Sequence, residues 1–377
     1  MKNRKGSAWL IALVAVLSLL AAGCGSSGGS DTSTTEKGAT TTTAAKGGPD
    51  TSGYADLSGT ITGQGSSFQD TFQQKASTGF DAAVKDAGGK TTVTYTKTGS
   101  SDGKKALADQ TVNYAGSDSA IKPEEAASFG KREILYFPVV GGPIAVAYNL
   151  KGVDTLNLSP ATLSGIFQAQ ITTWDDAAIK ADNPDATLPS TPITVVHRSD
   201  GSGTTKNFTK FLTVAAADSW KLDAGETVNW PASTQGIEKS TGVTSVIAST
   251  DGAVGYADLA DAAKQDLSVA SIGNTSGDFI APNPDSASAA LAAAKVNDDL
   301  TYDPLNMDAK GAYPITSPTW MLVDKVQSDQ ATADILKAYL NYVLTTGQDE
   351  AKGLLYAPLP ADLAAKAIAQ IDDITVG

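Results

Sequence analysis

Apolar and polar positions repeat one local pattern along most of the chain: a short β-branched run, a turn rich in glycine and serine, then a segment with helical spacing. Residues 193–196 predict a buried strand, and Phe208, Phe211 and Leu212 recur at the i, i+3 and i+4 spacing of a helix core face. Similar units occupy residues 61–84 and 93–110. Strands that alternate with helices predict an α/β fold, in which several of these turns converge on one ligand.

The remaining pattern predicts the other elements of this fold. Two apolar runs, 134–140 and 144–148, predict core strands separated by a Gly-Gly-Pro break near a lobe boundary. Ser159 followed by proline predicts the start of a helix. Residues 273–312 are polar, and we expect them to be irregular. A strand near 313–323 and two helices, at about 329–346 and 361–371, are expected to end the chain.

The first 56 residues have a different composition. A basic start, an apolar run over 9–22 and small residues predict an export signal over 1–23, and the run is short for a membrane span. Cys24, the only cysteine, follows Leu-Ala-Ala-Gly and resembles the lipidated cysteine of bacterial lipoproteins; a buried or incidental thiol is the alternative. Residues 24–56 predict a flexible tether. We therefore expect a lipid-anchored protein on the extracytoplasmic face of the cell membrane.

The net charge of the chain limits the classes of partner that it can bind. Its formal net charge is −13, and removal of Lys2, Arg4 and Lys5 with the leader would bring it to −16. Such a chain is a poor partner for nucleic acid. Because salt screens charges over roughly 8–10 Å, an acidic exterior is compatible with a locally positive anion site.

The stretch 197–205 carries the first candidate chemistry. Ser202, Gly203 and Thr204 would lie at a helix N-terminus, where unpaired backbone N–H groups and the positive end of the dipole favour anions. Arg198 adds a planar, permanently charged fork of donors. The stretch therefore predicts an oxyanion site, and an ordinary capped turn between a strand and a helix is the alternative.

The same stretch superficially resembles a hydrolytic triad, because His197, Asp200 and Ser202 lie close together. Triad members normally come from separate elements, and no Gly-x-Ser-x-Gly elbow surrounds Ser202. His197 is the only histidine and cannot join a multi-histidine zinc site, and the chain has no P-loop motif. We expect no catalysis, metal or cofactor, and a structural role for His197.

Asp118 adds a carboxylate to the expected anion site. A carboxylate repels an anion unless the anion still carries a proton to donate. Phosphate keeps at least one O–H at neutral pH and sulfate has none, so Asp118 would accept a hydrogen bond from phosphate and repel sulfate. The alternative role for Asp118 is a helix N-cap.

Motifs spread along the chain resemble the high-affinity phosphate-binding protein of the phosphate ABC importer, a type II periplasmic binding protein. The likeness runs in order from Leu57 to the C-terminus and is carried by residues 62–68, 99–101, 116–118, 162–167, 174–176, 195–205, 254–256 and 313–316. The resemblance implies two α/β lobes with a ligand cleft between them. We place lobe I at residues 57–146 plus 313–377, and lobe II at 147–312.

The resemblance also implies which residues hold the ligand. The expected phosphate-binding residues all lie in loops that would face the cleft: Ser67, Phe68, Ser100, Asp118, Arg198, Ser202, Gly203 and Thr204. Asp200 would pair with Arg198 and hold its orientation without touching the ligand. Asp102 stands where the family usually has glycine, and its carboxylate would weaken anion binding unless it points to solvent.

The function implied by the resemblance is capture of inorganic phosphate by a monomer, whose closed form docks on a membrane permease driven by a cytoplasmic ATPase. Three alternatives remain at this stage. They are a phosphate-ester hydrolase built on the same cleft, a binding protein for another oxyanion such as sulfate, and an adhesive surface lipoprotein.

Overall fold

The computed structural model describes residues 51–377. The predicted export signal (1–23), Cys24 and most of the predicted tether (24–56) lie outside the described residues. Tyr54, near the end of that predicted tether, lies in the 3-10 helix η1 (Tyr54–Asp56) and is buried. Its ring packs edge-on against Phe80, with ring centroids 5.5 Å apart. The folded part therefore begins by Tyr54, slightly before the expected start at Leu57.

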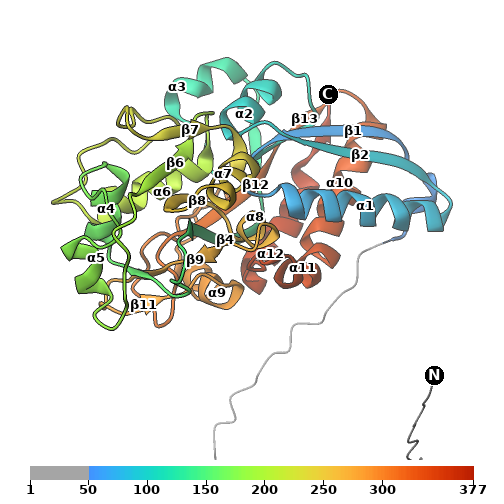
Figure 1. Cartoon of the computed structure of the whole chain (residues 1–377). Helices are drawn as coiled ribbons and strands as arrows, with labels where there is room; N and C mark the ends of the chain where they lie inside the picture. The colour runs from blue at the N-terminus through green and yellow to red at the C-terminus, as the bar shows by residue number, and fades with distance from the viewer. Residues whose placement is uncertain (1–50) are drawn as a thin grey trace, which may run out of the picture. The chain divides into compact units, whose positions relative to one another are not determined.

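The described chain alternates strands and helices as its sequence pattern predicts (Figure 1). The strands are β1 (Ser58–Gly65), β2 (Lys90–Lys97), β3 (Tyr114–Ser117), β4 (Ile134–Asn149), β5 (Asn157–Leu158), β6 (Thr194–Arg198), β7 (Gln235–Ile237), β8 (Ala253–Asp258), β9 (Ser268–Val269), β10 (Ser271–Gly273), β11 (Phe279–Ile280), β12 (Thr316–Asp324), β13 (Val326–Gln327) and β14 (Thr375–Val376). The helices are α1 (Asp70–Ala87), α2 (Ser100–Ala108), α3 (Pro123–Ala126), α4 (Pro160–Phe167), α5 (Ala177–Asp182), α6 (Gly203–Ala215), α7 (Lys239–Ser249), α8 (Leu259–Lys264), α9 (Pro284–Ala293), α10 (Gln330–Leu344), α11 (Thr346–Ala351) and α12 (Ala361–Gln370), with 3-10 turns η2 (Ala127–Phe129), η3 (Lys352–Leu354) and η4 (Ile371–Asp373).

A nine-stranded mixed sheet forms the centre of the fold, in the order β2-β1-β3-β12-β4-β8-β6-β7, with β9 also paired to β4. Strands β1, β2 and β3 are parallel to one another, as are β6, β7 and β8. Helices α1, α2 and α10 pack on the first group, and α6, α7 and α8 pack around β4, β6 and β8. The two groups lie toward opposite sides of Figure 1, and the predicted two-lobed α/β fold is confirmed.

The long strand β4 joins the two groups and corrects one sequence prediction. The Gly-Gly-Pro break was expected to separate two strands, but β4 runs through it without interruption. Its first part pairs with β12 as far as Pro143, and its second part, from Ile144 onward, pairs with β8. The glycines permit close packing instead of a turn, because a Cβ at Gly141 would lie 2.7 Å from the Leu291 side chain.

A second correction concerns residues 273–312, which were expected to be irregular. They contain α9, and the residues at its N-terminus are typical of a helix start, although the segment as a whole is polar. The Asn283 side chain accepts a hydrogen bond from the Ser286 backbone N–H at 2.9 Å, and Pro284 occupies the first turn. Both are favourable at a helix start.

Other local predictions are confirmed. Phe208, Phe211 and Leu212 of α6 are fully buried, as their spacing predicts. The Ser159 side chain caps α4, and the two terminal helices appear as α10 and α12. Within residues 51–377, no helix combines the length and the apolar character needed to span a bilayer.

Close backbone packing of α2 on the sheet yields a stability prediction. A Cβ at Gly103 would lie 2.6 Å from Gly65 Cα and 2.8 Å from the Gln64 carbonyl oxygen, and backbone atoms cannot turn aside. We expect Gly103→Ala to lower the free energy of unfolding by about 1–3 kcal/mol, measured by urea denaturation. Gly353→Ala is the matched control, because nothing lies within 4 Å of its added Cβ. Equal denaturation midpoints for the two variants would contradict this packing.

Candidate functional site

The candidate site lies where four strands end. The loops after β1, β2, β3 and β6 begin at Ser66, Thr98, Asp118 and Ser199, and each leaves the carboxyl end of a parallel strand. Such ends are the usual position of ligand sites in α/β sheets. The first three loops form one wall of the site, which we call the first wall. The turn after β6 and the start of α6 form the opposite wall, which we call the second wall.

Asp118 lies at the centre, 1% exposed, and its carboxylate accepts hydrogen bonds from three hydroxyls. The Ser66 and Thr319 hydroxyls donate at 2.6 and 2.7 Å, and the Thr204 hydroxyl of the second wall donates at 3.2 Å. Burial raises the pKa of Asp118 to about 6, while these hydroxyls and the charge of Arg198 act in the opposite direction. Asp118 is therefore mainly ionised at neutral pH and can accept further hydrogen bonds.

The neighbours of Asp118 are themselves held in place. Gln69 Nε2 donates to Thr319 Oγ1 at 2.7 Å, and Gln73 Nε2 donates to Gln69 Oε1 at 2.7 Å. All three side chains are buried. Because Thr319 Oγ1 receives this hydrogen bond from Gln69, its own proton is directed toward Asp118. The buried amides thus fix an acceptor site whose hydrogen-bonding direction is set before any ligand arrives.

Arg198 provides the positive charge of the second wall. It is 3% exposed, and its Nε donates to Asp200 Oδ1 at 2.6 Å, while its Nη2 pairs with Asp200 Oδ2. The remaining Nη1 donates to Ser67 Oγ of the first wall at 3.0 Å. Although burial opposes ionisation, the hydrogen bonds and charge of Arg198 hold the pKa of Asp200 below its usual value. Asp200 therefore orients Arg198 toward the first wall, in the pairing that the sequence predicts.

The start of α6 brings backbone donors to the same place. Ser202 caps the helix, with its Oγ accepting from the Thr205 N–H at 3.2 Å. The N–H groups of the first helical turn have no partner within the helix and carry the positive end of its dipole. A Cβ at Gly203 would lie 2.6 Å from Ser100 Oγ and 2.8 Å from Asp118 Cβ. Glycine is therefore required for α6 to approach the first wall this closely.

The two walls touch directly around this centre. The Ser101 N–H of the first wall donates to the Gly201 carbonyl of the second at 3.2 Å. The Ser240 N–H of α7, a helix that packs on β6, donates to Ser67 Oγ of the first wall at 3.2 Å. Asn207 Nδ2 donates to the Asp118 carbonyl at 2.8 Å. The central residues are consequently enclosed between segments that touch one another.

His197 takes the structural role that the sequence predicts. Its Nδ1–H donates to the Arg198 carbonyl at 2.9 Å, and its ring stacks on Trp230 with centroids 4.8 Å apart. Burial lowers its pKa. The Ser202 hydroxyl serves as the cap of α6, so His197 and Ser202 have separate roles. Among the described residues, no group of His, Cys, Asp and Glu side chains is arranged to hold a metal ion.

The structure brings all eight predicted ligand residues into this enclosed region, and every one of them is buried. Asp102 is exposed at the surface, which meets the condition under which its carboxylate does not oppose an anion. Sequence reasoning missed Ser66, Thr319 and Ser240. Ser66 could have been predicted from the sequence, because it stands beside Ser67 in the same turn. Thr319 and Ser240 come from distant elements, and no local pattern marks them.

Comparison with known proteins shows the family to which the chain belongs. A model of the PBP superfamily domain matches residues 27–346. Phosphate-binding protein PstS of Xylella fastidiosa (strain Temecula1) is 33% identical over 309 residues, which cover 80% of this chain and 82% of that protein. Phosphate-binding protein PstS of Haemophilus influenzae is 33% identical over 310 residues, covering 81% and 90% respectively.

Solved structures show the same fold at lower identity. A high-affinity periplasmic phosphate-binding protein named PfluDING, bound with phosphate, aligns with a TM-score of 0.70 and 23% identity over 82% of this chain and 93% of that one. A phosphate-binding protein from Stenotrophomonas maltophilia aligns with a TM-score of 0.66 and 19% identity over 82% and 93%. The resemblance noted from sequence motifs is thus confirmed, and the chain belongs to the PstS family of phosphate-binding proteins within the PBP superfamily.

Proposed function

We propose that this protein captures inorganic phosphate outside the cytoplasm and delivers it to an ABC import permease. The observation that carries the proposal is the pairing of a buried acceptor, Asp118, with a buried donor, Arg198, across one enclosed site. The names of the PstS relatives support phosphate as the ligand. The eight buried residues predicted from the sequence would form its binding shell: Ser67, Phe68, Ser100, Asp118, Arg198, Ser202, Gly203 and Thr204.

The chemistry of these groups favours a protonated oxyanion. Arg198, the hydroxyls and the helix N-terminus attract negative oxygen atoms. Asp118 adds a requirement, because an ionised carboxylate stabilises only a ligand oxygen that donates a proton. Leaving that carboxylate buried against an oxygen without a proton costs on the order of a few kcal/mol. Phosphate meets the requirement at neutral pH and sulfate does not.

The site favours binding over catalysis. The Ser202 hydroxyl accepts from the backbone of its own helix, and His197 stacks on Trp230, so these two side chains do not form a nucleophile–base pair. Phosphate release from a chromogenic ester that depends on Ser202 or His197 would instead support a hydrolase. We also propose that the protein acts as a monomer and is anchored through Cys24 to the outer face of the membrane. The proposed lobe I comprises residues 57–146 plus 313–377, and the proposed lobe II comprises residues 147–312.

Capture would involve closure of the two walls, and Glu226 is placed to stabilise the closed arrangement. Glu226 lies in the segment after α6, is 3% exposed, and is tied to the second wall through its carbonyl, which accepts from the Ser202 N–H at 3.0 Å. Among the described residues, the hydrogen bonds and ion pairs of its carboxylate reach the other side: Lys104 at 2.8 Å, Ser101 Oγ at 2.9 Å, Lys122 at 3.2 Å and the Ser119 hydroxyl. Burial raises the pKa of Glu226, but the charges and hydrogen bonds of Lys104, Ser119 and Lys122 together outweigh burial and lower that pKa to about 2.

The central test is a calorimetric titration with phosphate and with sulfate. We expect tight phosphate binding and little sulfate binding about two pH units above the Asp118 pKa of about 6. About one unit below that pKa, the protonated Asp118 becomes a donor, and sulfate affinity should rise by roughly tenfold or more. Equal affinities at the higher pH, or a sulfate affinity that does not change with pH, would contradict the role given to Asp118.

Glu226→Gln tests closure. The substitution removes one of the two carboxylates that buried Lys104 contacts in the closed arrangement and leaves only Glu125, at 2.7 Å. When the walls separate, water can solvate Lys104 instead. We expect the phosphate dissociation constant to rise by roughly tenfold, because the closed state is less populated. Calorimetry measures the change, and Glu124→Gln, at an exposed position on α3, is the control of equal charge. If the two variants bind phosphate equally well, Glu226 does not stabilise closure.

A further inference from the structure

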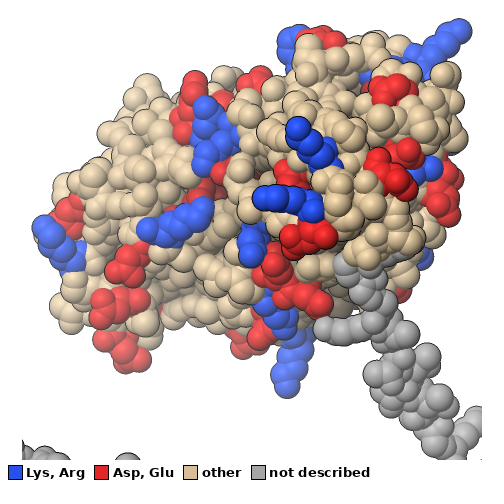
Figure 2. Space-filling view, turned by 90° about the vertical axis from the view of Figure 1, so that its right-hand side faces the viewer, with Lys and Arg blue, Asp and Glu red and all other residues tan. Residues whose placement is uncertain are grey.

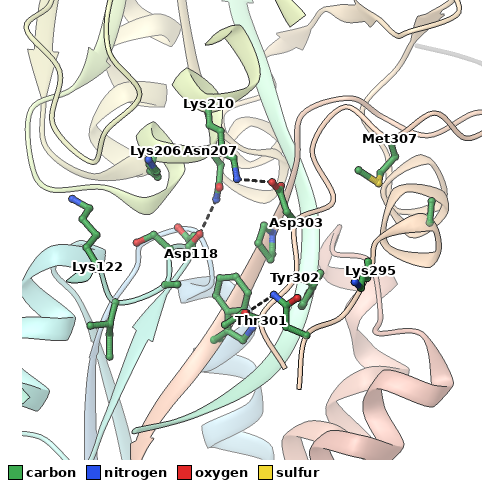
Figure 3. A pocket seen from close by; sticks show the side chains of 17 residues that line it. Asp118, Lys122, Lys206, Asn207, Lys210, Lys295, Thr301, Tyr302, Asp303 and Met307 are labelled. Carbon is green, nitrogen blue, oxygen red and sulfur yellow. Dashed lines mark hydrogen bonds and ion pairs between the residues drawn. The ribbon is translucent and has the colours of Figure 1, made fainter. Parts of the chain in front are cut away.

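A cavity of about 720 Å³ lies beside the enclosed site, and both walls contribute to it (Figure 3). The first wall supplies residues 118–122, which include Asp118 itself. The second wall supplies Lys206, Asn207 and Lys210 of α6. Pro318 and Trp320 of β12 and the segment after α9 complete the lining. The cavity therefore follows the seam along which the two walls meet, and it reaches the central carboxylate.

Four lysines line this cavity, and two of them lack a carboxylate partner. Lys210 pairs with Asp303 at 2.5 Å, and Lys122 pairs with Glu226 at 3.2 Å. In the described part of the chain, neither Lys206 nor Lys295 takes part in an ion pair. Among the residues that the structure describes, the Lys206 ammonium donates a single hydrogen bond, to the Ala224 carbonyl at 3.5 Å. Within residues 51–377, the ammonium groups of Lys206 and Lys295 are therefore the part of the cavity's positive charge that no ion pair neutralises.

The electrostatic surroundings of Lys206 agree with this picture. Partial burial is the largest effect on the Lys206 pKa and lowers it, and the neighbouring charges of Lys210 and Lys122 lower it further. The charges of Glu226 and Glu124 raise the same pKa by smaller amounts. Figure 3 shows Lys122, Lys206 and Lys210 on the side of Asp118, with Lys295 farther along the cavity. On the face shown in Figure 2, by contrast, acidic and basic side chains are interspersed. The lining of the cavity combines four lysines with two carboxylates, those of Asp118 and Asp303, so positive charge is in excess there.

Positive charge at the cavity would help an anion to approach this acidic protein. The chain has a formal net charge of −13, so its overall field repels a phosphate dianion. Salt screens that field beyond roughly 8–10 Å, so charges at the seam dominate the last part of the approach. Apart from Gly203, which is also buried, the predicted ligand residues are at most 3% exposed, so the walls must separate before phosphate reaches them.

We propose that the cavity lined by Lys122, Lys206, Lys210 and Lys295 is the entry vestibule through which phosphate is drawn toward the separated walls. The proposal rests on the proposed function. Lys206 and Lys295 act on the rate of association, since neither ammonium group is hydrogen-bonded to a predicted ligand residue in the closed arrangement. Once the walls close, the buried shell alone determines how slowly phosphate leaves.

Stopped-flow kinetics of phosphate binding, followed by tryptophan fluorescence over a series of ionic strengths, test this inference. Trp320 lines the cavity and provides a local probe. In the purified double variant Lys206→Gln/Lys295→Gln, the association rate constant should fall roughly three- to tenfold at low ionic strength, and its salt dependence should flatten. The dissociation rate constant should remain that of the parent protein.

The matched control is Lys85→Gln/Lys90→Gln, which changes net charge equally at exposed positions. Lys85 lies at the C-terminal end of α1 and Lys90 at the start of β2, the opposite end of that strand from the site loops. An unchanged association rate in the cavity variant, or an equal fall in the control, would overturn the vestibule and leave phosphate binding standing. A parent protein that binds no phosphate would overturn both proposals.

Discussion

The rest of the site depends on one constraint, which is that Asp118 is an almost fully buried carboxylate. A buried charge is costly unless hydrogen bonds and opposite charge compensate it. Here Ser66, Thr319 and Thr204 donate to it, and burial still leaves its pKa raised to about 6. These donors come from the loop after β1, from β12 and from α6, so the carboxylate has all three hydrogen bonds only when both walls are in contact. The same group therefore links ligand choice to closure.

The fold supplies what this carboxylate requires. Strands β1, β2 and β3 run parallel, so their loops meet at one edge of the sheet, and β6 brings Arg198 to the same place from the other lobe. Glycines at 65, 103, 116 and 203 permit backbone approaches that a Cβ would block. The negative charge of Glu226 and the positive charges of the lysines at the seam have different effects. Glu226 stabilises contact between the walls, whereas the unpaired lysines at the seam act on an anion before the walls close.

Much of this arrangement was predictable because its signals are local. The spacing of Phe208, Phe211 and Leu212 defines the buried face of α6, and the Arg198–Asp200 pair lies within three consecutive residues. Other features were not predictable, since they arise from packing between distant segments. Thr319 is 201 residues from Asp118, and Glu226 is 122 residues from Lys104. The continuity of β4 through Gly-Gly-Pro likewise depends on pairing with β12, which local pattern does not reveal.

The most direct test of the account is the pH dependence of sulfate affinity in Asp118→Asn, titrated beside the parent protein and with phosphate as the reference ligand. An amide has the shape of the carboxylate and does not titrate, and it can donate as well as accept. If Asp118 selects the ligand, the preference of this variant for phosphate over sulfate falls by roughly tenfold or more at neutral pH. Its sulfate affinity also no longer changes as the pH crosses the Asp118 pKa of about 6. A variant that keeps both the full preference and the pH dependence of the parent would contradict this role of Asp118.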